Sequence, residues 1–111
     1  MTAADATDAV FTALADPTRR GLFALLGARG EASATELARE LPVSRQAVQK
    51  HLGTLAGAGL VGTRRSGRAV LYRPTPAPMS DALVWMADVG GEWDDRLAAL
   101  RRQLGGAADR P

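Results

Sequence analysis

Apolar residues recur along the chain with two different periods, and the change between them falls at Gly59. Before Gly59, they follow the three- and four-residue steps of amphipathic helices. This pattern predicts four helices, over residues 6–15, 17–27, 35–41 and 44–58. After Gly59 the period becomes two, which predicts short strands at 60–65 and 68–73, and a last helix is expected over 80–104.

Local signals mark where these elements begin and end. Asp16-Pro17 is typical of a helix start, because the aspartate caps the helix and the proline needs no N–H donor there. Ser33 and Glu36 form a capping box before the third helix. Gly59 is expected to end the fourth helix in a left-handed conformation, and Ser66-Gly67 is expected to form the turn between the strands.

Two short helices joined by a tight turn and followed at once by a hairpin are the arrangement of a winged helix-turn-helix. We therefore expect a single, mainly α-helical domain over residues 1–104, with the element order α-α-α-α-β-β-α. Within it we predict a helix-turn-helix at 35–58, a β-hairpin wing at 60–73 and a C-terminal helix at 80–104. Residues 105–111 lack apolar anchors and are expected to be a flexible tail.

The fourth helix carries the residues that point to a function. Val48, Leu52 and Leu55 share one face and are expected to pack into the core. The opposite face holds amides and a cation, and no carboxylate occurs between Ser44 and Gly59. Such side chains suit base edges and phosphates in the major groove, and a helix N-terminus also binds phosphate. The predicted DNA contacts are Ser44, Arg45, Gln46, Gln49 and Lys50; the alternative is a merely solvated face.

Arginines surround the turn of the predicted hairpin. An arginine at the tip of a wing can enter a narrow minor groove, where the negative potential is enhanced. The alternative is that these charges only protect an edge hairpin against aggregation. We predict DNA contacts from Arg64, Arg65 and Arg68.

The last helix has an apolar stripe that repeats at alternating three- and four-residue steps, as in a coiled coil, with a weak position at Gly90. A monomer could bury this stripe on its own core. The domain is small, however, and the first helix has an apolar face that also needs cover. We therefore expect a homodimer through the first and last helices, with contacts from Val10, Phe11, Leu14, Leu83, Met86, Trp93, Leu97 and Leu100.

Composition excludes several classes of function. The chain has no cysteine and a single histidine, His51, so disulfides and thiolate metal sites are ruled out, and no metal or other cofactor is expected. Nothing resembles a nucleophile–base pair or a phosphate-binding glycine loop, so we predict no catalytic residue and no enzyme. No apolar run approaches the ~18 residues of a membrane span, and the N-terminus does not read as a secretory signal. A cytoplasmic protein that does not engage membranes is expected.

The net charge of +2 conceals an uneven distribution. Residues 17–73 carry ten bases and three acids, a net charge of +7, whereas residues 1–16 carry −3 and residues 74–111 carry −2. The positive charge therefore concentrates in the predicted helix-turn-helix and wing, as expected of a nucleic-acid-binding surface.

Three segments together strongly resemble the arsenical-resistance-repressor (ArsR) family of bacterial winged helix-turn-helix regulators: ALADPTRRGLFALL at 13–26, TELARELPVSRQAVQKHLGTLAGAGLV at 35–61 and RRSGRAVLYR at 64–73. The resemblance implies a homodimer that binds a short inverted repeat and represses its own operon. Metal-sensing members carry cysteines in the helix that matches residues 36–41, or Asp, His and Glu sets in the last helix. This chain has no cysteine in the helix that matches residues 36–41 and no histidine in its last helix. It therefore resembles the subgroup without metal-sensing cysteines.

Three functions remain open at this point. The first is a sequence-specific transcriptional regulator, a homodimer with double-stranded operator DNA as its partner. The second is a non-specific, nucleoid-type DNA-binding protein, whose binding competitor DNA would abolish. The third is a winged-helix module that binds protein, which the acid-free fourth helix disfavours. The sequence identifies neither the operator nor a small-molecule inducer.

Overall fold

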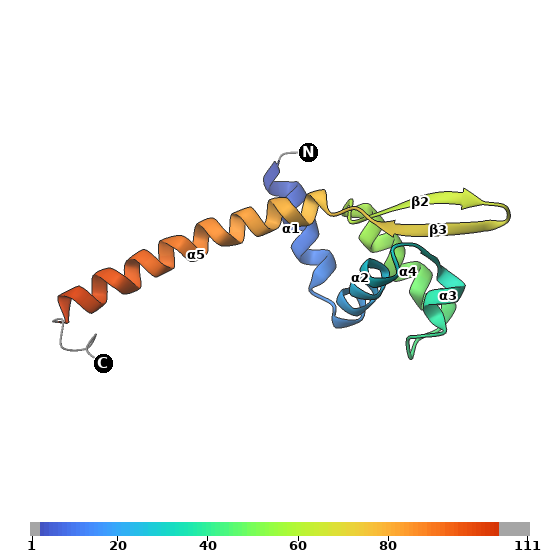
Figure 1. Ribbon diagram of the computed structural model, residues 1–111, viewed down its shortest axis with the longest axis horizontal. Helices are drawn as coiled ribbons and strands as arrows, with labels where there is room; N and C mark the ends of the chain where they lie inside the picture. The colour runs from blue at the N-terminus through green and yellow to red at the C-terminus, as the bar shows by residue number, and fades with distance from the viewer. Residues whose placement is uncertain (1–2, 105–111) are drawn as a thin grey trace.

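The computed structural model describes residues 3–104, and the predicted tail at 105–111 lies outside them. Figure 1 shows a helical body from which a two-stranded wing projects at one end and the last helix at the other. This architecture confirms the predicted winged helix-turn-helix class. The elements are α1 (Ala3–Leu14), α2 (Pro17–Arg29), β1 (Ala32–Ser33), α3 (Ala34–Ala38), α4 (Arg45–Gly57), β2 (Val61–Ser66), β3 (Ala69–Pro74) and α5 (Ala77–Gln103).

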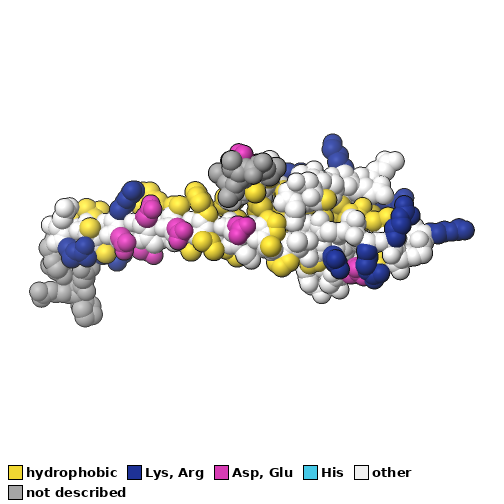
Figure 2. Space-filling view, turned by 90° about the horizontal axis from the view of Figure 1, so that it is seen from above, with side chains coloured by type: hydrophobic (Ala, Val, Ile, Leu, Met, Phe, Trp, Pro, Cys, Tyr) yellow, Lys and Arg dark blue, Asp and Glu magenta, His cyan; other side chains and the backbone are white. Residues whose placement is uncertain are grey.

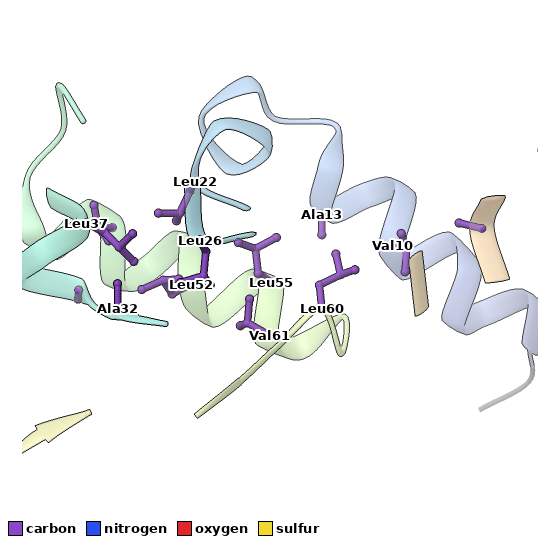
Figure 3. Packing of buried hydrophobic residues seen from close by; sticks show 13 residues of the cluster. Val10, Ala13, Leu22, Leu26, Ala32, Leu37, Leu52, Leu55, Leu60 and Val61 are labelled. Carbon is purple, nitrogen blue, oxygen red and sulfur yellow. The ribbon is translucent and has the colours of Figure 1, made fainter. Parts of the chain in front are cut away.

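The hydrophobic core lies between α2, α3 and α4 (Figure 3), and α1 and the first turns of α5 close it. The face of α4 predicted to be internal is confirmed, since Val48, Leu52 and Leu55 are fully buried. Val10 on α1 is 1% exposed and belongs to this core. It was expected at a dimer contact, and we correct that expectation because its side chain is already enclosed within one protomer.

The capping signals act as expected. The Ser33 hydroxyl accepts from the Glu36 amide at 3.2 Å, and the Glu36 carboxylate accepts from the Ser33 amide at 3.0 Å. The Asp16 carboxylate accepts from the Arg19 amide at 2.9 Å at the start of α2. Gly59 has φ +77°, which confirms the left-handed stop after α4.

The structure contains a short strand that was not predicted from the sequence. Ala32 and Ser33 form β1, which pairs antiparallel with β3, so the sheet has three strands in the order β1-β3-β2. Two residues are too few to show an alternating pattern, and Ser33 serves at the same time as the cap of α3. α3 ends at Ala38 rather than at 41, because the Arg39 and Glu40 amides donate to the carbonyls three residues back, which tightens the last turn. The proline at position 42 also disfavours a helical conformation in the residue before it.

α5 begins at Ala77, three residues earlier than predicted. Pro76 and Pro78 lie at this start, and proline fits the first turn of a helix, where no N–H partner is needed. The helix continues without interruption through Gly90-Gly91 to Gln103. Among the described residues, no helix is both long and apolar enough to cross a membrane.

Most of α5 extends away from the body (Figure 1). Its 27 residues correspond to a length of about 40 Å. The Cα radius of gyration is 19.4 Å, against about 13 Å for a compact chain of this length. Only the beginning of α5 packs on the core, where Ala82 is 2% exposed.

Candidate nucleic-acid interface

α4 presents a capped N-terminus and a polar outer face. The Ser44 hydroxyl accepts from the Ala47 amide at 3.1 Å and so caps the helix. The predicted contact residues Ser44, Arg45, Gln46, Gln49 and Lys50 are all exposed. Burial of the apolar face of α4 therefore leaves an outer face of amides and cations that is free of carboxylates.

The turn of the hairpin wing lies one residue later in the sequence than predicted. Ser66 pairs with Ala69, so the two turn residues are Gly67 and Arg68 rather than Ser66 and Gly67. Gly67 has φ +61° at the first turn position, as a type II′ hairpin requires, and only glycine adopts that conformation without strain. The shift places Arg68 at the tip of the wing instead of within the second strand.

A hollow of about 390 Å³ lies between the helix-turn-helix and the wing. Arg45 and Gln49 line it from α4, and Arg68 lines it from the wing. The structure thus brings together three predicted contact residues from two elements. Thr35 and Tyr72 also line the hollow. Neither was predicted from the sequence, because their place depends on how β3 lies against α3.

Arg64 is engaged within the protein. Its Nε and Nη2 donate to the two carboxylate oxygens of Glu31 at 2.7 and 2.6 Å. The hydrogen bonds from Arg64 lower the pKa of the Glu31 carboxyl, and the same bonds raise the pKa of the guanidinium. Together with the pairing of β1 and β3, this ion pair joins the base of the wing to the connection that follows α2. No feature of the sequence indicated it, since 33 residues separate the two side chains.

Of the other basic residues that the structure describes, some form ion pairs within the protein and others are exposed without one. Arg29 forms ion pairs with Glu36 and Glu40. Within residues 3–104, by contrast, no ion pair involves Arg45, Lys50, Arg65 or Arg68, and all four are exposed. On the face seen in Figure 2, basic side chains gather over the wing end and acidic side chains follow α5. Nor does that part of the chain bring three His, Cys, Asp or Glu side chains together as metal ligands.

The apolar residues predicted on α5 lie on an uncovered stripe. Their exposed fractions are 55% for Leu83, 43% for Met86, 57% for Trp93, 46% for Leu97 and 49% for Leu100. On α1, Phe11 and Leu14 are half-buried, and the Phe11 ring meets the Trp85 ring edge-on at 5.6 Å. The Arg96 guanidinium lies 5.5 Å from the centroid of the Trp93 ring. Trp85 and Val84 are also exposed and were not predicted as contacts.

Comparison with known proteins places this architecture among transcriptional regulators. A family model described as a helix-turn-helix domain matches residues 14–64. The transcriptional repressor SdpR of Bacillus subtilis is 30% identical over 88 residues, which cover 79% of this chain and 97% of that repressor.

Solved structures of transcriptional regulators are also similar to this chain in fold. An ArsR-like transcriptional regulator from a Rhodococcus species superimposes with a TM-score of 0.76 at 42% identity, over 88% of this chain and 92% of the other. A homodimeric winged helix-turn-helix DNA-binding domain from Mycobacterium bovis, a possible ArsR-family regulator, has a TM-score of 0.63 at 28% identity, over 76% and 79% of the two chains.

Proposed function

This chain belongs to the ArsR family of winged helix-turn-helix transcriptional regulators, and from that membership we propose that it is a homodimeric repressor of an inverted-repeat operator in the cytoplasm. Its relatives are regulators of transcription, which is a non-enzymatic role. The observation that carries the proposal is the exposed, carboxylate-free face of α4 beside a wing with Arg68 at its tip.

In the proposed complex, α4 lies in the major groove and the wing reaches the adjacent minor groove. Ser44 and Arg45 at the helix N-terminus face the phosphates, where the free amides favour negative charge. Gln46, Gln49 and Lys50 face base edges, because amide and ammonium groups match the acceptors and donors displayed there. Arg65 and Arg68 supply the wing contacts. The functional segments are thus residues 35–58 for the helix-turn-helix, 60–73 for the wing and 80–104 for dimerisation.

The wing arginines do not contribute equally in this proposal. Arg68 is free at the tip, so it neutralises a phosphate. Arg64 is already neutralised by Glu31, so we assign it the positioning of the wing rather than the direct contact expected from its place in the sequence.

A homodimer through α5 is supported by the surface that one protomer leaves uncovered. The accessible surface is 7499 Å², about 1,600 Å² more than a compact monomer of 11.6 kDa exposes. A stable interface covers about 800 Å² per partner. The apolar stripe on α5 is also continuous with the core, since Ala82 and Met79 lie at its beginning. A second protomer on this stripe would extend the core along the projecting helix.

The experiment that tests the function is recovery and sequencing of the genomic fragments that the full-length protein binds in its host. A regulator returns a few sites that share an inverted repeat, with half-sites about one helical turn, ~34 Å, apart. Excess random DNA should leave that binding nearly intact. Fragments without a shared motif, displaced by random DNA, would instead identify a non-specific coating protein.

Replacing Gln49 with alanine should weaken operator binding by about 1–3 kcal/mol, because a base edge loses its amide partner. Binding to random DNA should be unchanged. Titration of both DNAs with the variant and the parent protein measures the two effects. Gln46→Ala is also expected to weaken operator binding and to leave binding to random DNA unchanged. An equal loss on random DNA would show that these amides do not read bases.

Replacing Arg68 with alanine should reduce the slope of log K against log salt concentration by about 0.9, the value for one phosphate. Arg64→Ala provides the control, and its slope should change less because Glu31 already neutralises the guanidinium. Affinities measured at four or more salt concentrations give both slopes. An unchanged slope for Arg68→Ala would remove this residue from the phosphate contacts.

A further inference from the structure

Several hydrogen bonds fix the corner between α1 and α2. Only Ala15 and Asp16 separate the two helices. Asp16 caps α2 by accepting from the Arg19 amide, and this hydrogen bond is the main reason why the pKa of its carboxyl is lowered. The first turn of α2 is therefore anchored by the residue that ends the connection.

The side chains of Arg19 and Arg20 reach back from α2 to the end of α1. Arg19 donates from Nε to the Ala13 carbonyl at 2.6 Å and from Nη2 to the Thr12 carbonyl at 3.3 Å. Arg20 donates from Nη1 to the Leu14 and Ala15 carbonyls at 2.7 and 3.0 Å. The last four carbonyls of a helix normally lack intrahelical partners. Here two guanidinium groups bind three of the four at the end of α1, those of Thr12, Ala13 and Leu14, and also the carbonyl of Ala15. Their positive charge suits the negative dipole end of the helix.

This corner joins α2 to α1, which also packs against the core through Val10 and Ala13. On one side, α1 packs against α5 through the Phe11–Trp85 ring contact. On the other side, Leu22 and Leu26 of α2 are buried in the same core as Leu52 of α4. The corner therefore joins the helices proposed for dimerisation to the body that carries the DNA-contacting face of α4.

We propose that Arg19 and Arg20 are positioning residues that fix the angle between the dimerisation helices and α4, and so set the spacing of the two half-sites that the dimer recognises. This inference rests on the proposed function. Successive base pairs are about 3.4 Å apart, so a small change in the angle between α4 and the dimerisation helices is expected to alter the spacing that the dimer selects. Neither arginine needs to touch DNA.

The test replaces both arginines with lysine. Lysine keeps the positive charge at the end of α1 but lacks the planar fork through which Arg19 donates to two carbonyls from two nitrogens. Wild type and Arg19→Lys/Arg20→Lys are each given a pool of duplexes in which the two half-sites are separated by spacers of varied length. Wild type should select one spacing. The variant should select a broader range and bind the wild-type spacing at least about fivefold more weakly, a typical size for coupling between sites.

Control measurements separate positioning from loss of stability. Arg29→Lys alters an arginine at the other end of α2 that pairs with Glu36 and Glu40, and it should retain the wild-type spacing. Sedimentation should show that both variants remain dimers, and the affinity of each for random DNA should equal that of the wild type. If the double variant does not fold, the single variant Arg19→Lys answers the same question, because Arg19 donates to two carbonyls from two different nitrogens.

The outcomes distinguish this inference from the proposed function. A folded, dimeric lysine variant that keeps the sharp wild-type spacing overturns the role of Arg19 and Arg20 while leaving the operator model intact. Equal broadening in Arg29→Lys also overturns it, because any destabilisation would then suffice. A wild-type protein that selects no paired half-sites overturns the proposed function itself.

Discussion

Replacing Leu97 with aspartate is expected to convert the protein from a dimer to a monomer. Leu97 is 46% exposed in one protomer and lies within the apolar stripe of the projecting part of α5. In the proposed dimer, the new carboxylate would lie between two apolar helix faces without a partner, and burial of an unpaired charge is strongly unfavourable. The helix itself tolerates the change, because position 97 is solvent-accessible in the protomer.

Loss of the dimer should weaken operator binding by about two to four orders of magnitude, since linkage of two half-site contacts typically contributes that much. Binding to a single half-site should be unchanged. Sedimentation velocity reports the association state, and titration of operator and half-site duplexes reports the affinities.

Ala99→Asp is the matched control for this substitution. It introduces the same carboxylate two residues further along α5, which is about 200° around the helix from position 97. That variant should remain dimeric and bind the operator like the wild type. A dimer that persists in Leu97→Asp would show that the interface lies elsewhere on the molecule.

The features predicted correctly from the sequence are those whose physical cause is local. The capping box at Ser33 and Glu36 involves residues three apart, and Gly59 ends α4 through its own backbone conformation. The inward face of α4 follows from the spacing of its apolar side chains, and its outer face is fixed by the same spacing. The spacing alone was therefore enough to place the site residues of this helix on its surface.

Two of the features that were missed depend on contacts between distant segments. β1 exists because Ala32 and Ser33 meet β3, and nothing in those two residues alone specifies a strand. Arg64 resembles any other basic residue of a wing until Glu31 is found opposite it. The shifted turn at Gly67-Arg68 is a local error: the glycine was recognised, but its position within the turn was not.

The structure also changes the meaning of the +7 charge over residues 17–73. Arg19 and Arg20 bind carbonyls at the end of α1, and Arg29 and Arg64 bind carboxylates. Four of the ten bases in this region therefore serve the fold. The smaller set on the outer face of α4 and at the wing tip is what remains for DNA, so charge summed over a segment overstates the binding surface.

Replacing Leu52 with alanine should cost about 2–5 kcal/mol of unfolding free energy, the range for truncating a fully buried leucine. Leu52 is 0% exposed at the centre of α4 and belongs to the core shared by α2, α3 and α4. Small domains have a total stability of about 5–15 kcal/mol, so a large part would be lost. The outer face of α4 needs this core to hold it, and operator binding should fall as the folded fraction falls.

Lys50→Ala provides the control for Leu52→Ala, because it truncates an exposed side chain on the same helix to the same residue. It should change stability by no more than about 0.5 kcal/mol while weakening DNA binding. Urea denaturation must be compared at several protein concentrations, since the stability of a dimer depends on concentration. The two variants should thus separate the roles of the two faces of α4: one face supports the fold, and the other contacts DNA. Equal stability losses in both would mean that the polar face also holds the helix in place.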